Sequence, residues 1–513
     1  MLHTRRRQST LAAVAGIAAF TIALAGCQSA VDRDTTGSAE PIEGGTLSVA
    51  QSGDMQPRNL MAARAGNATW ASNVFETLTT YDDNTEPQPM LATDWTLADD
   101  GMSMQITLRD DVTFHSGKAM TADDVKFSIE TSADPSYNAQ VGYIARSFTA
   151  VTVSSPTELT IEFSAPTANI FDFFEQTYIV DSETIAGLAD GSEVVGTGPF
   201  TFESWSPGSE AKLARFDGYW GEKPYLDAID IAIITDSTAM LNAVRSNRTQ
   251  VSSGMNAVDV QTLSSNSAYT IINSASAAYP FGVDTTVAPF DNKAARQAVQ
   301  YAIDRERIAD QIFGDAGQVT NLFWDASTPD YPADLENFYT YDTDKAKALL
   351  AEAGAAGSDV EITVIGLPSN TGVAEIIRNN LEEVGLNPVI TVQDPQTWDQ
   401  NQVAGELGQS FLPLHGLNGF GPSTLLNVLP SLREGNPSKF WPAEYVELRD
   451  ALATASDAEN ADALYTLTEY ILDEAFTGVI VQSAGQIVES SEVQEMDYTS
   501  RGYLQAGAAF IEE

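Results

Sequence analysis

Alternating apolar and polar positions mark the strands that we expect in the first half of the chain. Ser103–Leu108 and Phe200–Phe202 place every second side chain on the same face, which is the period of a strand with one buried side. Val151–Val153 and Leu159–Phe163 are two further apolar runs, close together in the sequence. They predict an antiparallel meander.

The stretch 196–231 predicts a hairpin that ends in an aromatic corner. Gly196, Gly198 and Pro199 favour a tight turn, because glycine permits positive φ and proline fixes φ. The strand at Phe200–Phe202 runs into a Ser-Pro-Gly turn, and a second strand is expected at Ala211–Phe216. Tyr219 and Trp220 follow as the corner, and a third strand begins near Ile229.

Helical spacing appears beside buried strands in the second half. Asp291 is the expected cap of a helix over Lys293–Phe313, whose apolar positions recur at helical intervals. A strand at Val360–Ile365, a helix at Val373–Val384 and a strand at Val389–Val392 predict one βαβ unit. A helix at 461–476 and a strand at 479–482 complete this part. The pattern predicts an α/β protein.

Length and charge limit the classes of protein that remain. A chain of 513 residues is too long for one hydrophobic core, so two or three lobes are expected. The 26 basic and 71 acidic side chains give a net charge of −45, which argues against nucleic-acid binding. The acidity is typical of a solvated surface, although a preference for cationic solutes would produce it too.

The N-terminus predicts export. Arg5, Arg6 and Arg7 precede an apolar run from Leu11 to Ala25, too short for a comfortable membrane span and typical of a signal peptide over residues 1–26. Small residues before Cys27 resemble the bacterial lipobox, so we expect cleavage there and a lipid on the Cys27 thiol. The alternative is an ordinary signal peptide followed by an incidental cysteine.

Cys27 is the only cysteine in the chain, which excludes an internal disulfide and cysteine-rich metal sites. Residues 27–43 are polar and rich in small side chains, so they predict a flexible tether between the lipid and the folded part. The general secretory route is favoured because no full twin-arginine motif follows the basic residues.

Three segments together resemble one family. They are Pro-Gln-Pro-Met-Leu-Ala-Thr-Asp-Trp with its continuation (87–129), Gly-Thr-Gly-Pro-Phe through Tyr-Trp-Gly-Glu-Lys-Pro-Tyr-Leu-Asp (196–227), and Pro-Phe-Asp-Asn-Lys-Ala-Ala-Arg-Gln-Ala-Val-Gln-Tyr-Ala-Ile-Asp-Arg-Glu-Arg-Ile (289–308). The chain resembles the extracytoplasmic solute-binding proteins of peptide and nickel ABC transporters (family 5), over essentially all of 44–513.

The resemblance implies an α/β periplasmic-binding-protein-like fold of type II, with two lobes, a solute cleft between them and an extra inserted domain. The expected division is given by residue ranges: lobe I 44–81, 186–275 and 486–513; inserted domain 82–185; lobe II 276–485. It also implies a monomer without a cofactor that captures a small solute by hinge closure. The partners implied are permease subunits and, through the lipid, the outer face of the cell membrane.

The segment 411–422 corresponds to the ligand loop of the family, where peptide binders carry an aspartate that pairs with the α-ammonium group. If Pro422 is aligned with the family proline, Asn418 takes the place of that aspartate; an ungapped alignment from Trp398 puts Phe420 there instead. Either way the acid is missing, which argues against an ordinary peptide ligand, because a neutral amide does not offset the desolvation of a buried ammonium. His415 and Gly416 belong to the same candidate loop.

Five more residues are candidates for contact with the solute, and core packing is the alternative for the four aromatic ones. Trp398 aligns with a family tryptophan beside the cleft. Asp284 stands where many relatives have asparagine, so the carboxylate that is missing from the ligand loop would be supplied from this position instead. Tyr279, Tyr143 and Trp324 lie in segments that approach the cleft in relatives.

Enzyme activity is not indicated. No nucleophile elbow, His-Glu-x-x-His motif or phosphate-binding loop occurs, and His115 and His415 are the only histidines after the signal peptide. His115 is expected to be structural. His415 is a metal-chelate contact only if the solute is a chelate, as in the nickel-binding relatives, and no metal site is expected otherwise. A solute-sensing receptor is the remaining alternative.

Overall fold

The structure is a computed structural model, and it describes residues 41–62, 65–82, 85–499 and 501–512. Cys27, the predicted signal peptide and most of the predicted tether lie outside these residues. The described residues belong to one compact unit. Among them, no helix has the length and apolar character needed to cross a membrane.

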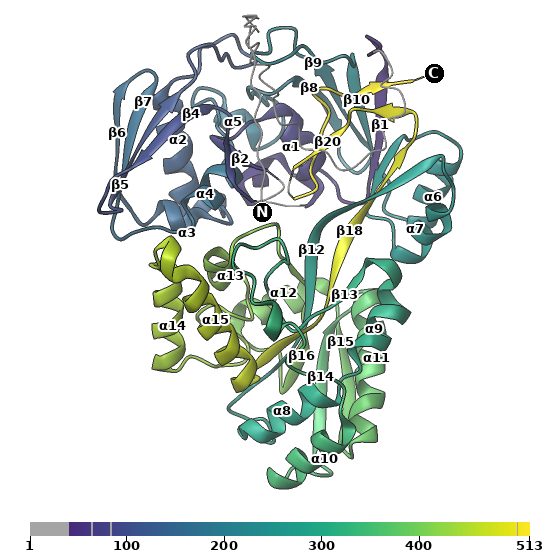
Figure 1. Cartoon of the computed structure of the whole chain (residues 1–513). Coiled ribbons are helices and arrows are strands. Elements are labelled where there is room, and N and C mark those ends of the chain that lie inside the picture. The colour runs from purple at the N-terminus through teal and green to yellow at the C-terminus, as the bar shows by residue number, and fades with distance from the viewer. Residues whose placement is uncertain (1–40, 63–64, 83–84, 500, 513) are drawn as a thin grey trace, which may run out of the picture. The chain divides into compact units, whose positions relative to one another are not determined.

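One large mixed sheet runs through this unit (Figure 1). In spatial order its main strands are β15 (Asn387–Gln393), β14 (Asp359–Ile365), β16 (Ser410–Leu412), β12 (Tyr269–Val283), β18 (Thr477–Ser490), β11 (Val251–Ser253), β1 (Thr46–Gln51), β10 (Ala228–Ile233), β9 (Glu210–Arg215) and β8 (Phe200–Ser206). Two short strands, β13 (Gly317–Val319) and β17 (His415–Gly416), pair with β18 and β12. The pairs β1–β10 and β14–β15 are parallel.

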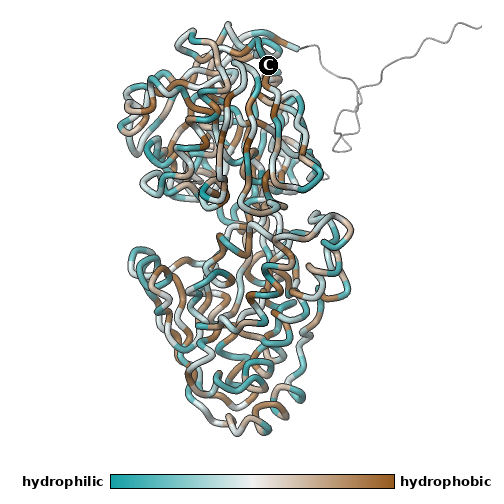
Figure 2. The backbone as a smooth tube through the Cα atoms, turned by 90° about the vertical axis from the view of Figure 1, so that its left-hand side faces the viewer, coloured by the Kyte–Doolittle hydropathy of each residue, from teal (hydrophilic) through white to brown (hydrophobic). Residues whose placement is uncertain are grey.

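The ribbon of β12 and β18 joins two halves of the described chain. We call the half that contains β1 and β8–β11 the first lobe, and the half that contains β14–β16 the second lobe. At one end of the ribbon Ile272 and Ile487 pack in the core of the first lobe; at the other end Phe281 and Ile480 pack in the core of the second. Figure 1 shows the ribbon running between the halves, and Figure 2 shows the two halves joined by a narrow connection.

A second, antiparallel sheet lies in the same half as β1 and β8–β11 and is counted with the first lobe; its order is β4 (Ala92–Leu97), β5 (Ser103–Leu108), β7 (Glu158–Phe163) and β6 (Phe148–Ser155). It contains the predicted meander, within the predicted inserted domain. Its strands are accompanied by α2 (Ala122–Ala133), α3 (Gly142–Ala145) and α4 (Ile170–Gln176). The boundaries of that domain, 82–185, remain a prediction.

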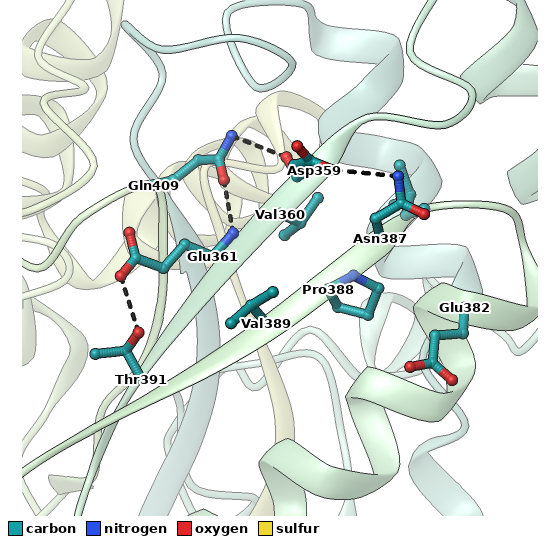
Figure 3. Close-up of a pocket in the computed structure, with 10 residues that line it drawn as sticks. Asp359, Val360, Glu361, Glu382, Asn387, Pro388, Val389, Thr391 and Gln409 are labelled. Atoms are coloured by element: carbon teal, nitrogen blue, oxygen red, sulfur yellow. Dashed lines mark hydrogen bonds between the residues drawn. The ribbon is translucent and has the colours of Figure 1, made fainter.

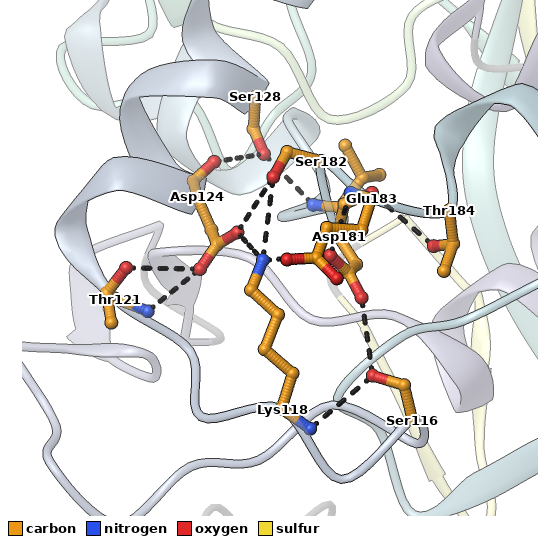
Figure 4. A network of polar contacts seen from close by, with 10 residues as sticks. Ser116, Lys118, Thr121, Asp124, Ser128, Asp181, Ser182, Glu183 and Thr184 are labelled. Carbon is orange, nitrogen blue, oxygen red and sulfur yellow. Dashed lines mark hydrogen bonds and ion pairs between the residues drawn. The ribbon is translucent and has the colours of Figure 1, made fainter.

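A buried polar network fixes α2 (Figure 4). Lys118 Nζ lies 2.6 Å from Asp124 and 2.9 Å from Asp181. The other oxygen of Asp124 accepts the Thr121 backbone N–H, which completes a capping box at the helix start. One lysine therefore links α2 to the segment 181–184.

The stretch 196–231 adopts the predicted hairpin and aromatic corner. Tyr219 Oη and Trp220 Nε1 donate hydrogen bonds of 2.8 and 2.7 Å to the buried Glu76 carboxylate. His115 holds the turn: its Nε2 donates to Gly198 O at 3.0 Å, and its Nδ1 accepts from Gly196 N at 3.3 Å. This is the structural role expected of His115.

The second lobe contains the predicted βαβ unit, with α11 (Pro368–Glu383) between β14 and β15. The predicted helix over 293–313 is wrong in two respects. Its cap is Asn292 rather than Asp291, and α8 (Lys293–Ala302) ends before an extended Ile303. A new turn, α9 (Arg305–Ile308), starts at the cap Asp304 and continues into η4 (Ala309–Phe313).

The reason for the break is the side chain of Arg305. It is buried, and its guanidinium donates to Gln300 O and Gln300 Oε1 at 2.8 and 2.6 Å. Gln300 lies near the end of α8, so these bonds bind the end of one helix to the start of the next. They replace helical backbone bonds that a continuous helix would make there.

The remaining elements are short connections, helices that cover the sheet, and paired strands near the C-terminus. They are η1 (Pro57–Ala62), η2 (Ala65–Asn67), α1 (Ala68–Val74), β2 (Thr79–Tyr81), β3 (Pro87–Pro89), η3 (Pro135–Tyr137), α5 (Ile185–Leu188), α6 (Ser237–Arg245), α7 (Ala257–Ser264), η5 (Gly314–Ala316), η6 (Ala333–Leu335), α10 (Thr343–Glu352), α12 (Pro395–Ala404), α13 (Pro422–Val428), α14 (Ala443–Ala453), α15 (Asp457–Glu474), β19 (Val493–Gln494), β20 (Asp497–Tyr498), β21 (Leu504–Gln505) and β22 (Phe510–Ile511).

Candidate functional site

The ribbon changes character where it passes between the lobes. Asn273 of β12 and Gly485 of β18 are exposed, whereas both ends of β18 and the C-terminal end of β12 are buried. The strand register also shifts between Asn273 and Ser276. Small, solvated residues around a break in register form the natural place for the backbone to bend.

The candidate loop 415–424 is fixed to this ribbon. Its first residues form β17, in which His415 and Gly416 pair with Ala278 and Ala277 of β12. The loop then turns through Asn418, with φ of 52°, and Gly419, with φ of 64°, before α13 begins at Pro422. A turn anchored in this way moves with the second lobe.

The loop meets the first lobe at Asp172 of α4. The Asp172 carboxylate accepts hydrogen bonds from Gly421 N at 3.1 Å, from the Thr424 hydroxyl, and from Tyr81 Oη at 3.1 Å. Asp172 is 3% exposed, and its burial raises the pKa of the carboxyl, while hydrogen bonds from Thr424 and Tyr81 and the charge of Arg501 act in the opposite direction.

Asn169 makes a second polar contact between the lobes. Its amide nitrogen donates to Tyr143 Oη at 2.8 Å and to Thr424 Oγ1 at 3.0 Å. Burial raises the pKa of Tyr143, so its phenol stays neutral. Thr424 therefore joins two residues of the first lobe, Asp172 and Asn169.

Arg501, from the C-terminal segment, makes the third contact. Its guanidinium forms an ion pair with Glu175, and the side chains of the two residues are only 3% and 6% exposed. The guanidinium carbon also lies 4.7 Å from the centre of the Phe420 ring, in the second lobe. A buried cation above an aromatic face is an attractive contact across the lobes.

A small cavity of about 40 Å³ lies beside Arg501. It is lined by Ser72, Thr77, Thr80, Met90, Glu175, Gln176, Tyr178, Thr499, Arg501, Tyr503 and Gln505. Arg501 Nε is buried and has no hydrogen-bond partner among the described residues. The cavity and the loop contacts together form the candidate site.

A larger groove of about 860 Å³ lies at the outer edge of the sheet, along β14 and β15 (Figure 3). Its polar groups already bond one another: Gln409 accepts from Glu361 N at 2.7 Å, and Thr391 donates to the Glu361 carboxylate at 2.9 Å. Satisfied groups at an open edge are typical of a solvated surface.

His415 faces the protein interior. It is 3% exposed, its Nε2 lies 2.7 Å from Ser431 Oγ, and burial lowers the pKa of the imidazole to about 4. The ring is therefore neutral at physiological pH. In the described part of the chain, no three His, Cys, Asp or Glu side chains gather in a way that could hold a metal ion.

Four other predicted candidates have partners within the protein. Trp324 donates from its indole to Thr468 at 2.8 Å, and Asp284 forms an ion pair of 2.7 Å with Lys439. The Tyr279 hydroxyl lies 3.4 Å from Ser369 Oγ, and Trp398 is buried against Leu407 and Phe411. Of the predicted residues, the structure brings Tyr143 and Phe420 to the contact between the lobes.

Asp172, Asn169, Arg501 and Glu175 were not identified by sequence reasoning. Asp172 and Gly421 are separated by 249 positions, and Arg501 and Glu175 by 326. Nothing in the local sequence distinguishes these two acids from the 71 acidic residues of the chain. The terminal segment was expected to return to the first lobe, and that expectation is the only signal that pointed toward Arg501.

Comparison with known proteins finds solute-binding proteins at the levels of both family and individual relatives. Residues 86–434 match the family described as bacterial extracellular solute-binding proteins, family 5 middle. The chain is 24% identical to the oligopeptide-binding protein AppA of Bacillus subtilis over 434 residues, covering 77% of this chain and 80% of AppA. It is 26% identical to the nickel-binding periplasmic protein of Escherichia coli, covering 97% of each.

Solved structures agree on the fold. The substrate-binding protein CtaP of Listeria monocytogenes superposes with a TM-score of 0.83 at 21% identity, covering 92% of this chain and all of CtaP (100%). The periplasmic binding protein DppA of Helicobacter pylori, solved with the peptide STSA, gives a TM-score of 0.78 at 21% identity, covering 92% and 99%.

Proposed function

The chain belongs to the bacterial extracellular solute-binding proteins of family 5, the non-enzymatic solute-binding components of ABC importers, and from this premise we propose where and how it holds its solute. The solute binds between the two lobes, with loop 415–424 on one side and the face formed by Tyr81, Asp172 and Arg501 on the other. Binding closes the lobes about the ribbon of β12 and β18.

The observation that carries this proposal is the nature of the contact between the lobes. Thr424 and Gly421 reach the first lobe through hydrogen bonds to Asp172 and Asn169, and Phe420 reaches it through Arg501. The same contact includes apolar side chains, because Phe173 and Phe174 of α4 belong to one buried cluster with Leu425 of the second lobe. The solvated stretch of the ribbon is where the two halves can bend apart. A solute that touches both lobes stabilises the closed form by its difference in affinity between the two forms.

The proposed solute is a small organic molecule of the oligopeptide type or a comparable compound. An affinity in the micromolar range needs about 8 kcal/mol, which an enclosed cleft with a few polar anchors supplies. Relatives include oligopeptide-, dipeptide-, nickel- and heme-binding proteins. The bond of His415 to Ser431 and its burial favour an organic solute over a metal chelate held by this imidazole.

The proposal includes a lipid on Cys27 that holds the protein on the outer face of the cell membrane. There it delivers its solute to the permease subunits of the importer as a monomer. The supporting features are the basic and apolar N-terminus, the small residues before Cys27 and the polar tether that follows.

The test is native mass spectrometry of the full-length protein purified from its own host, combined with small-angle X-ray scattering. One bound solute per chain is expected, and its removal should increase the radius of gyration, because the lobes open. A protein that carries no solute, and whose radius of gyration is unchanged by any solute fraction from its host, would contradict the proposal.

A variant locates the site. Phe420→Ala removes the ring beneath Arg501 and should weaken binding of the co-purified solute by about tenfold or more. Val403→Ala, at a 75% exposed position of α12, is the control and should bind as the wild type does. Equal affinity of the two variants on titration calorimetry would remove Phe420 from the site.

A further inference from the structure

One N–H of a buried guanidinium has no acceptor within the protein. Arg501 is 4% exposed, and its guanidinium forms an ion pair with Glu175. The Nε–H of the same group is buried and has no hydrogen-bond partner in the described part of the chain. Buried donors in native proteins are nearly always paired with protein, water or a ligand. The Nε–H of Arg501 therefore points to an acceptor that comes from outside the chain.

The cavity of about 40 Å³ brings further donors to this N–H. Arg501 lines it together with two phenols, Tyr178 and Tyr503. Burial raises the pKa of both hydroxyls, so they keep their protons and are able to donate. Among the described residues, neither hydroxyl forms a hydrogen bond. Gln176 and Gln505 complete this side of the lining with amide N–H groups.

The cavity lies in the first lobe, next to the contact between the lobes. The guanidinium carbon of Arg501 is 4.7 Å from the centre of the Phe420 ring, which belongs to the second lobe. Arg501 thus borders both the cavity and that contact. Of the lining residues, Thr80, Met90 and Tyr503 are partly exposed, so the cavity is not sealed from solvent.

The charges around the cavity limit the kind of acceptor. A cation would meet the positive charge of Arg501 and an N–H that points the wrong way for it. An anion would compete with the Glu175 carboxylate for the same guanidinium, and the charge of Asp172 also acts on Arg501. An uncharged oxygen avoids both costs and still accepts the hydrogen bond.

We propose that this cavity is a subsite for one uncharged carbonyl group of the solute, such as a carboxamide, whose oxygen accepts the hydrogen bond of Arg501 Nε–H. The inference rests on the proposed function and deepens it, because it names the chemistry of one part of the solute. A water molecule occupies about 30 Å³ in the liquid. A cavity of about 40 Å³ therefore receives one compact group, while the rest of the solute stays in the cleft.

Three probes of one shape test the inference, because they differ in charge: acetamide is neutral, acetate is an anion and acetamidinium is a cation. The full-length protein, isotopically labelled at arginine Nε and freed of co-purified solute, gives an NMR signal for the Nε–H of Arg501. Arg501→Lys identifies this signal by its loss. Acetamide should shift the signal saturably, with an affinity about tenfold or more above those of the two charged probes.

A variant of the lining adds a second measurement. Tyr503→Phe removes one hydroxyl and keeps the ring, so it should weaken acetamide binding by about fivefold. Tyr465→Phe, at an exposed position of α15, is the matched control and should bind acetamide as the wild type does. Protein that still carries its co-purified solute should show no shift with acetamide, because the carbonyl group of the solute already occupies the cavity.

Absence of a saturable shift with acetamide would show that the cavity takes up water alone, and it would overturn the inference. Equal affinities for the three probes would do the same, and so would acetamide binding that the co-purified solute does not block. If Arg501→Lys does not fold, wild-type crystals soaked in acetamide show directly whether its oxygen lies beside Arg501 Nε.

These measurements do not depend on closure of the lobes. A co-purified solute that closes the lobes but has no uncharged carbonyl group would sink this inference and leave the proposed function standing. Lobes that stay open with every solute would remove the proposed function, whatever the result with acetamide.

Discussion

Glu76 lies beneath Tyr219 and Trp220 and is 4% exposed. Burial raises the pKa of its carboxyl from 4.5 to about 7, against the opposing effect of the hydrogen bonds from Trp220 and Tyr219. The folded protein therefore holds this proton more tightly than the unfolded chain does. The stability that it contributes is fully present below pH 4.5 and is lost as the pH rises through about 7.

Glu76→Gln should remove this pH dependence, because an amide does not titrate. Its oxygen still accepts from Trp220, and its nitrogen can donate to the Tyr219 oxygen. The wild type should lose on the order of 1–3 kcal/mol of stability between pH 5 and pH 8 through this group, and the variant should not. Melting temperatures at pH 5, 6, 7 and 8 measure the difference.

The control is Glu130→Gln, at an exposed position of α2, which should melt with the same pH dependence as the wild type. If Glu76→Gln and the wild type show parallel curves of melting temperature against pH, Glu76 does not titrate in this range.

At the scale of single residues, Phe420 and Tyr143 belong to segments with a family counterpart and lie at the contact between the lobes. Their contact with the solute stays a prediction. Asp172 and Arg501 were not predicted, because their importance comes from partners 249 and 326 positions away. Burial is what distinguishes Asp172 from the other acids, and the sequence of so acidic a chain does not show which of its carboxylates are buried.

At the scale of elements, local patterns gave accurate strands. The alternating run at 103–108 is β5, Ser103–Leu108. The error over 293–313 has a physical cause: the apolar spacing continues across 303, while the break depends on the buried bonds of Arg305 to Gln300. Periodicity reports which face is buried and does not report such bonds.

The turn at 196–199 gives a prediction at this scale. A Cβ at Gly196 would lie 1.9 Å from Val74 O, and Gly198 N already bonds that same oxygen at 3.0 Å. Gly196→Ala must therefore push α1 away from the hairpin. We expect a loss of about 2–4 kcal/mol, measured by urea unfolding.

Gly507→Ala is the matched control. The added Cβ there would have its nearest neighbour, Pro199 Cγ, at 3.9 Å, which is ordinary contact. The change should be within about 0.5 kcal/mol of the wild type. Comparable unfolding midpoints for the two variants would show that the turn tolerates a side chain.

At the scale of the whole molecule, the fold separates two tasks. Each lobe has a buried apolar core, and the lobes meet through the polar contacts of Asp172, Asn169 and Arg501 together with an apolar cluster that contains Phe173 of α4 and Leu425 of the second lobe. Separate cores allow the lobes to move as rigid bodies about the ribbon. The fold class was predictable because family segments are spread over the chain, while the closed contact was not, because it joins distant segments.

The predicted lipid on Cys27 concerns the location of the whole molecule. Lipid chains contribute about 0.8 kcal/mol per buried CH₂, so two or more chains on Cys27 hold the whole protein at the membrane. Cys27→Ala should move the protein from the membrane fraction to the soluble extracytoplasmic fraction without changing its melting temperature. Ser29→Ala is the control and should stay with the membrane. Retention of Cys27→Ala in washed membranes would contradict lipid attachment.

The place of β18 in the sheet has a consequence for biogenesis. This strand, Thr477–Ser490, lies between β12 and β11, in the middle of the strand order, yet it follows every other strand of this sheet along the chain. Neither lobe can complete its sheet until the ribosome has added these residues. The sheet of the nascent polypeptide thus stays incomplete until residues 477–490 have been made, and before that point the chain keeps the open form that a narrow secretion channel requires.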